Sequence, residues 1–118
     1  MKSILLVAFG GAIGSCIRYL LNKLMLWNSF PLSTWIINIS GSFLIGILFA
    51  YTLKNPESKW INLFLMTGLC GGFTTFSTFS LETLRLLQNH QYQLAIFYML
   101  SSVIVALAAT FLGFVIAK

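Results

Sequence analysis

The sequence predicts an all-α membrane protein, a single domain over residues 1–118 with four transmembrane helices, the third broken near its middle. Only 8% of the residues are charged and 58% are hydrophobic, whereas soluble domains have about 25% charged residues. The apolar residues form four stretches, each near the roughly 20 residues that a bilayer crossing needs. The third stretch contains GGFTTFSTFS, whose Gly, Thr and Ser residues are weak helix formers.

The first predicted span covers residues 3–26. It resembles a signal peptide at its start, but the apolar run continues past Cys16, so we expect an uncleaved span. Gly10 and Gly14 form a Gly-xxx-Gly face that favours close helix packing. Arg18 lies deep in the span, where an arginine either marks a functional site or extends to the membrane edge.

The second predicted span covers residues 33–53 and carries a polar stripe of Thr34, Asn38, Gly41 and Ser42. Spacings of three and four residues place these side chains on one helix face. The Asn38 amide is too polar to face lipid. It therefore either bonds a neighbouring helix or lines a pore.

The third predicted span, residues 60–87, holds the break. Unwound backbone at membrane depth is tolerated only where it is buried in protein or lines a wet cavity. Carbonyls freed at such a break favour cations, and freed N–H groups favour anions. Phe76 and Phe79 lie on adjoining faces of one turn, and Glu82 and Arg85, also three apart, are placed to pair at the helix end.

The fourth predicted span, residues 93–117, has a second polar stripe. Tyr98, Ser102, Ala106 and Thr110 follow one another at intervals of four residues, with Ala106 as a gap. The stripe serves either hydrogen bonding between helices or an ion path.

Charged and aromatic residues mark the ends of the spans. With four spans, both termini lie on one side of the membrane, and the basic residues divide only weakly between the sides. One side has Lys2, Lys54, Lys59 and Lys118; the other has Lys23 and Arg85, with Arg18 deeper. A bias this weak does not fix one orientation, so we expect dual topology and an antiparallel homodimer with an inverted copy. An aromatic belt in contact with membrane lipid is expected from Trp27, Trp35, Tyr51, Trp60 and Tyr92.

The polar groups within the spans are mostly hydrogen-bond donors, which suits a small anion. The basic residues are scattered singly, so nucleic acid is not an expected partner. Since no nucleophile–base or metal-ligand set is visible, we do not expect an enzyme. The alternative function is a small multidrug-type cation exporter, which needs a carboxylate within the membrane. A structural membrane subunit would not need two polar stripes and a broken helix.

Three motifs carry a resemblance over the whole chain: GGAIGSCIRY at residues 10–19, NISGSFLIG at 38–46 and GLCGGFTTFSTFS at 68–80. With them, the sequence resembles the Fluc fluoride channels of bacteria, also called the CrcB family. The resemblance implies an antiparallel homodimer in the bacterial inner membrane, with two separate pores for passive fluoride exit. It also implies a structural Na⁺ at the dimer centre, bound by the backbone carbonyls of Gly71 and Thr74.

The resemblance also assigns the fluoride pathway. Its pore phenylalanines correspond to Phe76 and Phe79, and Arg18 corresponds to a vestibule arginine. The remaining positions are Asn38, Ser77, Thr78, Tyr98 and Ser102. Tyr98 and Ser102 correspond to a polar track on the fourth helix of the family, and the third position of that track falls on Ala106, where some relatives carry a hydroxyl. This departure leaves the outer part of the track open and makes Thr110 a candidate extension.

Overall fold

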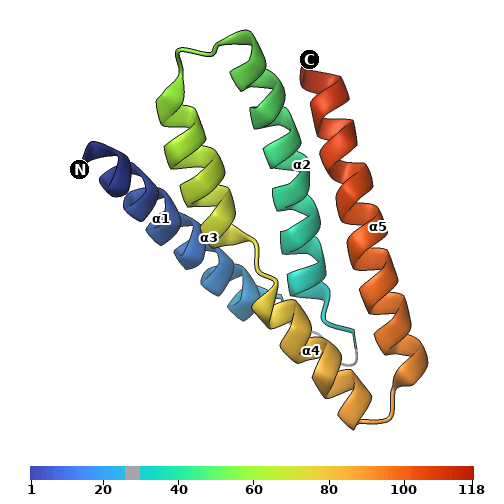
Figure 1. The fold of residues 1–118 in the computed structure, drawn as a ribbon. Coiled ribbons are helices and arrows are strands. Elements are labelled where there is room, and N and C mark those ends of the chain that lie inside the picture. Colours follow the sequence, from blue (N-terminus) through green and yellow to red (C-terminus); the bar gives the residue numbers. More distant parts are fainter. Residues whose placement is uncertain (26–29) are drawn as a thin grey trace.

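The computed structural model describes residues 1–25 and 30–118, and all regular structure in these ranges is helical. The elements are α1 (Lys2–Leu24), α2 (Leu32–Lys54), η1 (Ile61–Cys70), α3 (Gly71–Phe73), α4 (Ser77–Gln88) and α5 (Tyr92–Ala117) (Figure 1). The end of the first predicted span and the belt residue Trp27 lie outside the described residues.

Within the described ranges, three helices are long and apolar enough to cross a membrane, namely α1, α2 and α5. The chain is therefore a multi-pass membrane protein. The third predicted span corresponds to η1 and α3, which follow one another directly, and to α4, which residues 74–76 separate from α3.

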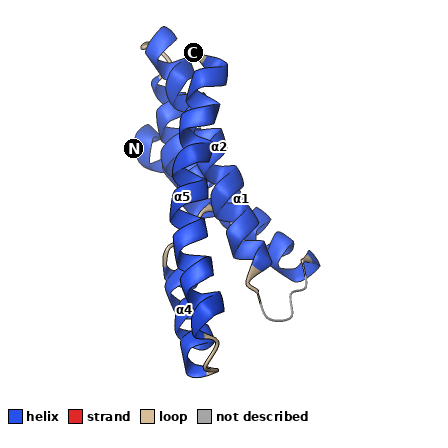
Figure 2. Cartoon of the chain, turned by 90° about the vertical axis from the view of Figure 1, so that its right-hand side faces the viewer, coloured by secondary structure: helices blue, strands red, loops and turns tan. Residues whose placement is uncertain are grey.

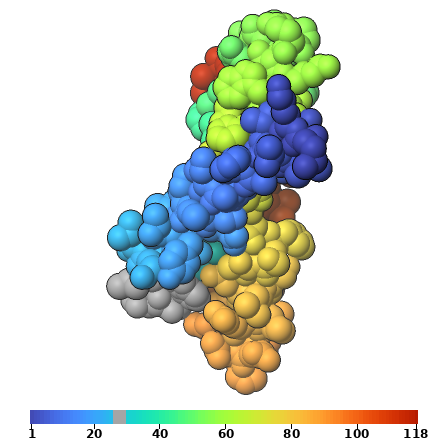
Figure 3. Space-filling view, turned by 90° about the vertical axis from the view of Figure 1, so that its left-hand side faces the viewer, coloured from blue at the N-terminus to red at the C-terminus, as the bar shows by residue number. Residues whose placement is uncertain are grey.

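Two pairings of helices organise the bundle. α2 and α5 lie side by side and run in the same direction, while α1 packs along η1 and α3 (Figure 1). Figure 3 shows α1 running obliquely across this second group. Towards its C-terminal end, α1 diverges from α4 and α5 (Figure 2). Both termini lie at the end of the molecule that also holds the α2–η1 loop (Figure 1).

Glycines allow the α1 contact with η1 and α3. A β-carbon at Gly10 would overlap the carbonyl oxygen of Phe64, and one at Gly14 would overlap that of Leu69. The backbones thus approach more closely than any other residue would allow, which confirms the predicted close packing of this Gly-xxx-Gly face.

Close contacts at glycines also fix the register of α2 against α5. Gly46 lies directly on the carbonyl of Thr110, and Gly113 lies on the carbonyl of Phe43. Because each glycine faces backbone of the other helix, a sliding motion of one helix would drive side chains into these contacts. The register of α2 and α5 is therefore well defined.

Polar contacts reinforce the α2–α5 pair at both ends. The Lys54 ammonium donates to the carbonyl of Ala117 at 2.8 Å, and the Trp35 indole N–H donates to Ser101 Oγ at 3.0 Å. Trp35 was predicted to belong to the interfacial belt. Its ring is half-buried and bonded within the bundle, because α5 offers its indole a hydroxyl. Its place in the belt stays a prediction.

The segment before the break has π-helical hydrogen bonding over Ile61–Cys70. The Gly71 N–H is shared between the carbonyls of Met66 and Gly68. α3 then ends at Phe73, Thr74 is extended with φ −82° and ψ 158°, and α4 begins at Ser77. π-helical turns are rare and frequent at functional sites. Nothing in the sequence pattern predicted this one.

Candidate functional site

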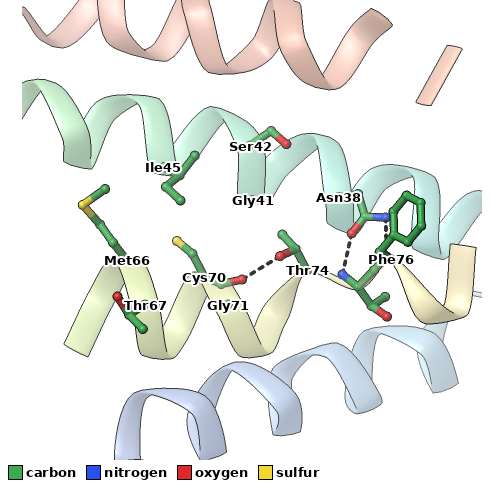
Figure 4. Close-up of a pocket in the computed structure, with 11 residues that line it drawn as sticks. Asn38, Gly41, Ser42, Ile45, Met66, Thr67, Cys70, Gly71, Thr74 and Phe76 are labelled. Carbon is green, nitrogen blue, oxygen red and sulfur yellow. Dashed lines mark hydrogen bonds between the residues drawn. The ribbon is translucent and has the colours of Figure 1, made fainter. Parts of the chain in front are cut away.

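Asn38 of α2 bonds the extended backbone between α3 and α4. Its Nδ2 donates to the Thr75 carbonyl at 3.0 Å, and the Thr75 N–H donates to Asn38 Oδ1 at 2.8 Å (Figure 4). The side chain thereby satisfies two backbone groups that the interruption leaves without helical partners. Of the two roles left open by the sequence, bonding to a neighbouring segment is observed. The amide has a second N–H, so a role as pore donor stays a prediction.

Hydroxyls surround the first turn of α4. Thr75 Oγ1 accepts the Thr78 N–H at 3.2 Å and lies 3.3 Å from Ser77 Oγ. Ser77 is exposed and Thr78 is half-buried. N–H groups at a helix start carry partial positive charge, so this turn offers donors to an anion.

The C-terminal end of α3 gathers acceptors. The N–H and the hydroxyl of Thr74 both donate to the Cys70 carbonyl, at 3.0 and 2.9 Å. Arg18 of α1 donates from Nε to the Gly72 carbonyl at 3.1 Å. Arg18 therefore reaches the end of α3, where it meets the negative end of the helix dipole.

The carbonyls of Gly71 and Thr74 remain open. In the described part of the chain, neither accepts a hydrogen bond outside the regular helices. Gly71 is exposed and Thr74 is half-buried. Oxygen atoms of this kind at a helix C-terminus suit a hard cation. The described residues contain no group of three His, Cys, Asp or Glu side chains able to hold a metal, so such a site would depend on these carbonyls.

Three aromatic rings lead from the surface to the interior. The ring centroids of Phe76 and Phe79 are 5.4 Å apart, and those of Phe79 and Tyr98 are 5.1 Å apart. Phe76 is 76% exposed, whereas Tyr98 is fully buried. Phe79 lies between them and is half-buried. The structure thus places both predicted phenylalanines and the predicted tyrosine in one continuous group.

Glu82 belongs to the same region. Tyr98 Oη donates to Glu82 Oε1 at 3.1 Å, and Glu82 is only 6% exposed. The predicted pairing of Glu82 with Arg85 is wrong: Arg85 is exposed, and no ion pair joins the two within the described residues. The reason is that α5 covers the Glu82 face of α4 and supplies the tyrosine. Sequence reasoning missed Glu82 as a site residue; its signal was a lone carboxylate in an apolar segment.

The stripe on α5 continues one turn beyond Tyr98. Ser102 is buried, and its hydroxyl has no partner among the described residues. Thr110, by contrast, donates its hydroxyl to the Ala106 carbonyl of its own helix at 3.1 Å. A buried hydroxyl without a partner is costly, so the Ser102 hydroxyl is left with an unused capacity for hydrogen bonding.

An open cavity of about 510 Å³ lies between α2 and the α3–α4 connection. Its polar lining comes from Asn38, Ser42, Thr67, Thr74 and Thr75, and Figure 4 shows the first four of these around Gly71 and Cys70. The cavity therefore joins the Asn38 amide to the open carbonyl region of α3. Arg18 and Ser102 are not among the residues that line it.

Fold and site together define a small, multi-pass, all-helical membrane protein whose polar groups converge on a helix interruption. Comparison with known families is consistent with this class. Residues 5–114 match the family described as CrcB-like protein, Camphor Resistance (CrcB), and the chain belongs to this family. The resemblance seen in the sequence motifs is thereby confirmed.

Similar proteins from bacteria align with this chain over most of their own length. A protein of Flavobacterium psychrophilum named fluoride-specific ion channel FluC is 46% identical over 123 aligned residues, covering 100% of this chain and 98% of that protein. One of Gloeothece citriformis with the same name is 46% identical, with the same coverage. Fluoride-specific ion channel FluC 2 of Bacillus subtilis is 45% identical, covering 96% of this chain and 88% of that protein.

Proposed function

We propose that this chain forms a fluoride-selective ion channel that lets fluoride leave the cytoplasm passively. The observation that carries the proposal is full-length similarity, at 45–46% identity, to proteins named fluoride-specific ion channels. The cluster of hydrogen-bond donors at the helix interruption supports it, because a small anion needs donors in place of its water shell.

The proposed assembly is an antiparallel homodimer of dual topology, in which η1, α3 and α4 together make the fourth, broken crossing. One chain alone leaves Phe76 exposed beside the open cavity. A second copy packed on this face would cover both. The weak division of basic residues between the two ends supports insertion in both orientations.

A structural Na⁺ is proposed at the centre of this dimer. Each chain contributes the two open carbonyls of Gly71 and Thr74, so an inverted pair would supply about four oxygens to one cation. The ion would supply fixed positive charge there. It would stabilise the carbonyl oxygens of Gly71 and Thr74, which carry partial negative charge and accept no hydrogen bond from the described residues outside the regular helices. Arg18 already occupies the carbonyl of Gly72, which leaves the other two for the cation.

The proposed pathway is lined by hydrogen-bond donors, none of which would hold fluoride tightly enough to stop its passage. Phenylalanine rings have an electropositive edge, and Phe76 and Phe79 would present theirs to the ion. Hydroxyls of Ser77, Thr78 and Ser102, the Tyr98 ring and the remaining Asn38 N–H would complete the path, with Arg18 attracting anions to its mouth. Weak, repeated sites allow an ion both to enter and to leave.

The setting that fits this activity is a bacterial inner membrane. All three relatives described above come from bacteria, and passive exit requires only a membrane that separates the cytoplasm from its surroundings. No coupling to another ion is needed.

Efflux from liposomes tests the proposed function. Purified protein is reconstituted into vesicles loaded with potassium fluoride or potassium chloride, and valinomycin is added to balance charge. We expect rapid release of fluoride, detected with a fluoride electrode, and release of chloride close to that of protein-free vesicles. Equal rates for the two anions, or no fluoride release, would refute the proposal.

One observation favours the alternative, a small multidrug-type cation exporter. Such a pump requires a carboxylate within the membrane, and Glu82 is buried inside the helix bundle. Its hydrogen bond from Tyr98, however, already engages the carboxylate. Uptake of a cationic dye driven by a proton gradient in the same vesicles would distinguish the two functions, and we expect none.

A further inference from the structure

The polar stripe of α5 is interrupted at Ala106, and a hydroxyl of α2 lies opposite the turn of α5 that begins there. We propose that Ser42 supplies, from across the α2–α5 contact, the hydrogen-bond donor that α5 lacks at Ala106. In this proposal Ser42 is a fluoride-contacting residue of the pathway. The inference rests on the proposed channel function and adds a residue to it.

The register of the two helices places Ser42 opposite the turn of α5 that begins at Ala106. A β-carbon at Gly46 would lie between the Thr110 carbonyl and the Phe114 N–H, so Gly46 stands opposite the turn from 110 to 114. Ser42 stands about one turn before Gly46. Because α2 and α5 run in the same direction (Figure 1), Ser42 lies opposite the preceding turn of α5, from Ala106 to Thr110. The Trp35–Ser101 hydrogen bond, further back along both helices, shows that the pairing continues there.

The Ser42 side chain points to the side of α2 that the proposed role requires. In Figure 4, Ser42 lies towards the α5 side of α2, whereas Asn38 points to the connection after α3. Ser42 also lines the cavity that Asn38 lines. The two residues are four apart, so their side chains are neighbours on the helix surface. An ion bound at the Asn38 amide would therefore find Ser42 as its next polar contact along α2.

The Ser42 hydroxyl is also available. Many hydroxyls on these helices donate to carbonyls of their own helix, as Ser40, Thr83 and Thr110 do. Among the described residues, Ser42 makes no such bond. It is half-buried, so it can face an ion without being fully solvated. In this respect it resembles Ser102, whose hydroxyl is also without a partner there.

Beyond this level the surroundings turn apolar. The adjoining groove shares Ile45 and Met66 with the polar cavity and continues past Phe49 and Phe114. Its hydroxyl residue, Thr110, has its hydrogen bound to the Ala106 carbonyl. An ion leaving Ser102 would therefore meet neither a free donor on α5 nor a polar wall. Ser42 supplies the donor at this point.

The experiment moves the hydroxyl from one helix to the other. Four variants are compared with the unmodified protein in the liposome efflux assay: Ser42→Ala, Ala106→Ser, the double variant Ser42→Ala/Ala106→Ser, and the control Ser40→Ala. Ser40 is exposed and its hydroxyl donates to the Ile37 carbonyl. Size-exclusion chromatography of each variant shows whether the assembly is retained.

We expect Ser42→Ala to lower the initial rate of fluoride efflux by about tenfold, as loss of one hydrogen bond to an anion implies. The double variant should recover most of the rate, and Ser40→Ala should leave it unchanged. A packing role for Ser42 would not be rescued by a hydroxyl on α5. An unchanged rate in Ser42→Ala, or a double variant as slow as the single one, overturns the inference. If the unmodified protein releases no fluoride, the proposed function itself fails.

Discussion

Asn38 and Thr75 exchange two hydrogen bonds, 3.0 and 2.8 Å long, although they are 37 residues apart in the chain. The amide of α2 thus takes the place of the backbone partners that Thr75 would have in an unbroken helix. This relationship fixes the connection between α3 and α4 at a defined depth in the bundle. It also links the first turn of α4, with its proposed hydrogen-bond donors to the anion, to α2, the helix that lines the cavity.

Replacing Asn38 should therefore damage both stability and flux. In Asn38→Ala, the N–H and carbonyl of Thr75 lose their partners, which should cost about 1–3 kcal/mol in the free energy of unfolding. Fluoride efflux should fall at least as strongly, since the first turn of α4 loses its anchor. Thermal unfolding in detergent and liposome efflux measure the two effects.

Asn55→Ala is the matched control for this prediction. The Asn55 amide donates to the Tyr51 carbonyl at the exposed end of α2. Its loss should change stability by less than about 0.5 kcal/mol and leave flux intact. Should Asn38→Ala behave like Asn55→Ala, the connection does not depend on the amide.

The sequence predicted some parts of the structure correctly and others not. Apolar length predicted α1, α2 and α5, and small residues predicted where helices approach, as Gly10 and Gly14 confirm. Such features depend on local composition. The partner of Glu82 was predicted wrongly because helical spacing considers only neighbours in sequence, whereas Tyr98 arrives from another helix. The bond from Asn38 to Thr75 likewise depends on tertiary packing.

The π-helical hydrogen bonding of η1 shows a second limit. Its sequence, INLFLMTGLC, is as apolar as a buried α-helix, and no residue in it demands the wider turn. η1 packs closely on α1, where a β-carbon at Gly68 would lie 2.9 Å from the carbonyl oxygen of Val7. A contact between segments so distant in sequence is not visible in a local pattern.

The variant Gly71→Val should leave the folding of a single chain intact and prevent two chains from forming the proposed dimer. A β-carbon at Gly71 would have only the Met66 carbonyl near it, at 4.0 Å, and the backbone there is helical. The single chain therefore has room for valine. In the proposed dimer, the same branched side chain would stand beside the cation and the inverted copy. We expect helical content to persist in circular dichroism while the dimer and its fluoride flux are lost.

Gly14→Val provides the contrasting variant. Its β-carbon would overlap the Leu69 carbonyl within one chain, so the fold itself should be destabilised. A fully assembled, active Gly71→Val protein would count against both the proposed interface and the Na⁺ site.

Removal of sodium should weaken the proposed dimer. Neutral carbonyls brought together without a cation repel one another, and binding to the assembled form alone stabilises it by mass action. Protein dialysed into N-methylglucamine buffer should therefore unfold or dissociate at lower temperature than in sodium, with restoration on adding sodium chloride. The control is choline chloride at equal ionic strength. If it restores stability equally, a general salt effect is responsible.

Tyr98→Phe tests the buried contact with Glu82. The change removes the hydroxyl that donates to Glu82 Oε1 but keeps the ring that packs on Phe79. A buried carboxylate that loses its donor should cost about 1–3 kcal/mol in stability. Because the aromatic group is retained, flux should fall less than in Asn38→Ala. The double variant Tyr98→Phe/Glu82→Gln should recover part of the stability, and absence of any recovery would argue that the hydroxyl acts elsewhere.

The exposure of Phe76 makes its role open to a decisive test. Its side chain is 76% exposed and contacts Phe79 at 5.4 Å between centroids, so it contributes little to packing within one chain. Isoleucine keeps apolar bulk but has no electropositive ring edge. Phe76→Ile should therefore leave unfolding temperature and assembly nearly unchanged while fluoride efflux falls by orders of magnitude.

Phe79→Ile should lose flux as well, but with a measurable loss of stability, since Phe79 is half-buried against Tyr98. Leu84→Ile, at an exposed position of the same helix, controls for the substitution itself and should be silent in both assays. The difference between the two phenylalanine variants distinguishes a lost ring edge from lost packing. If both variants release fluoride near the unmodified rate, ring edges do not bind the permeating ion, and the pathway must depend on the hydroxyls and the Asn38 amide alone.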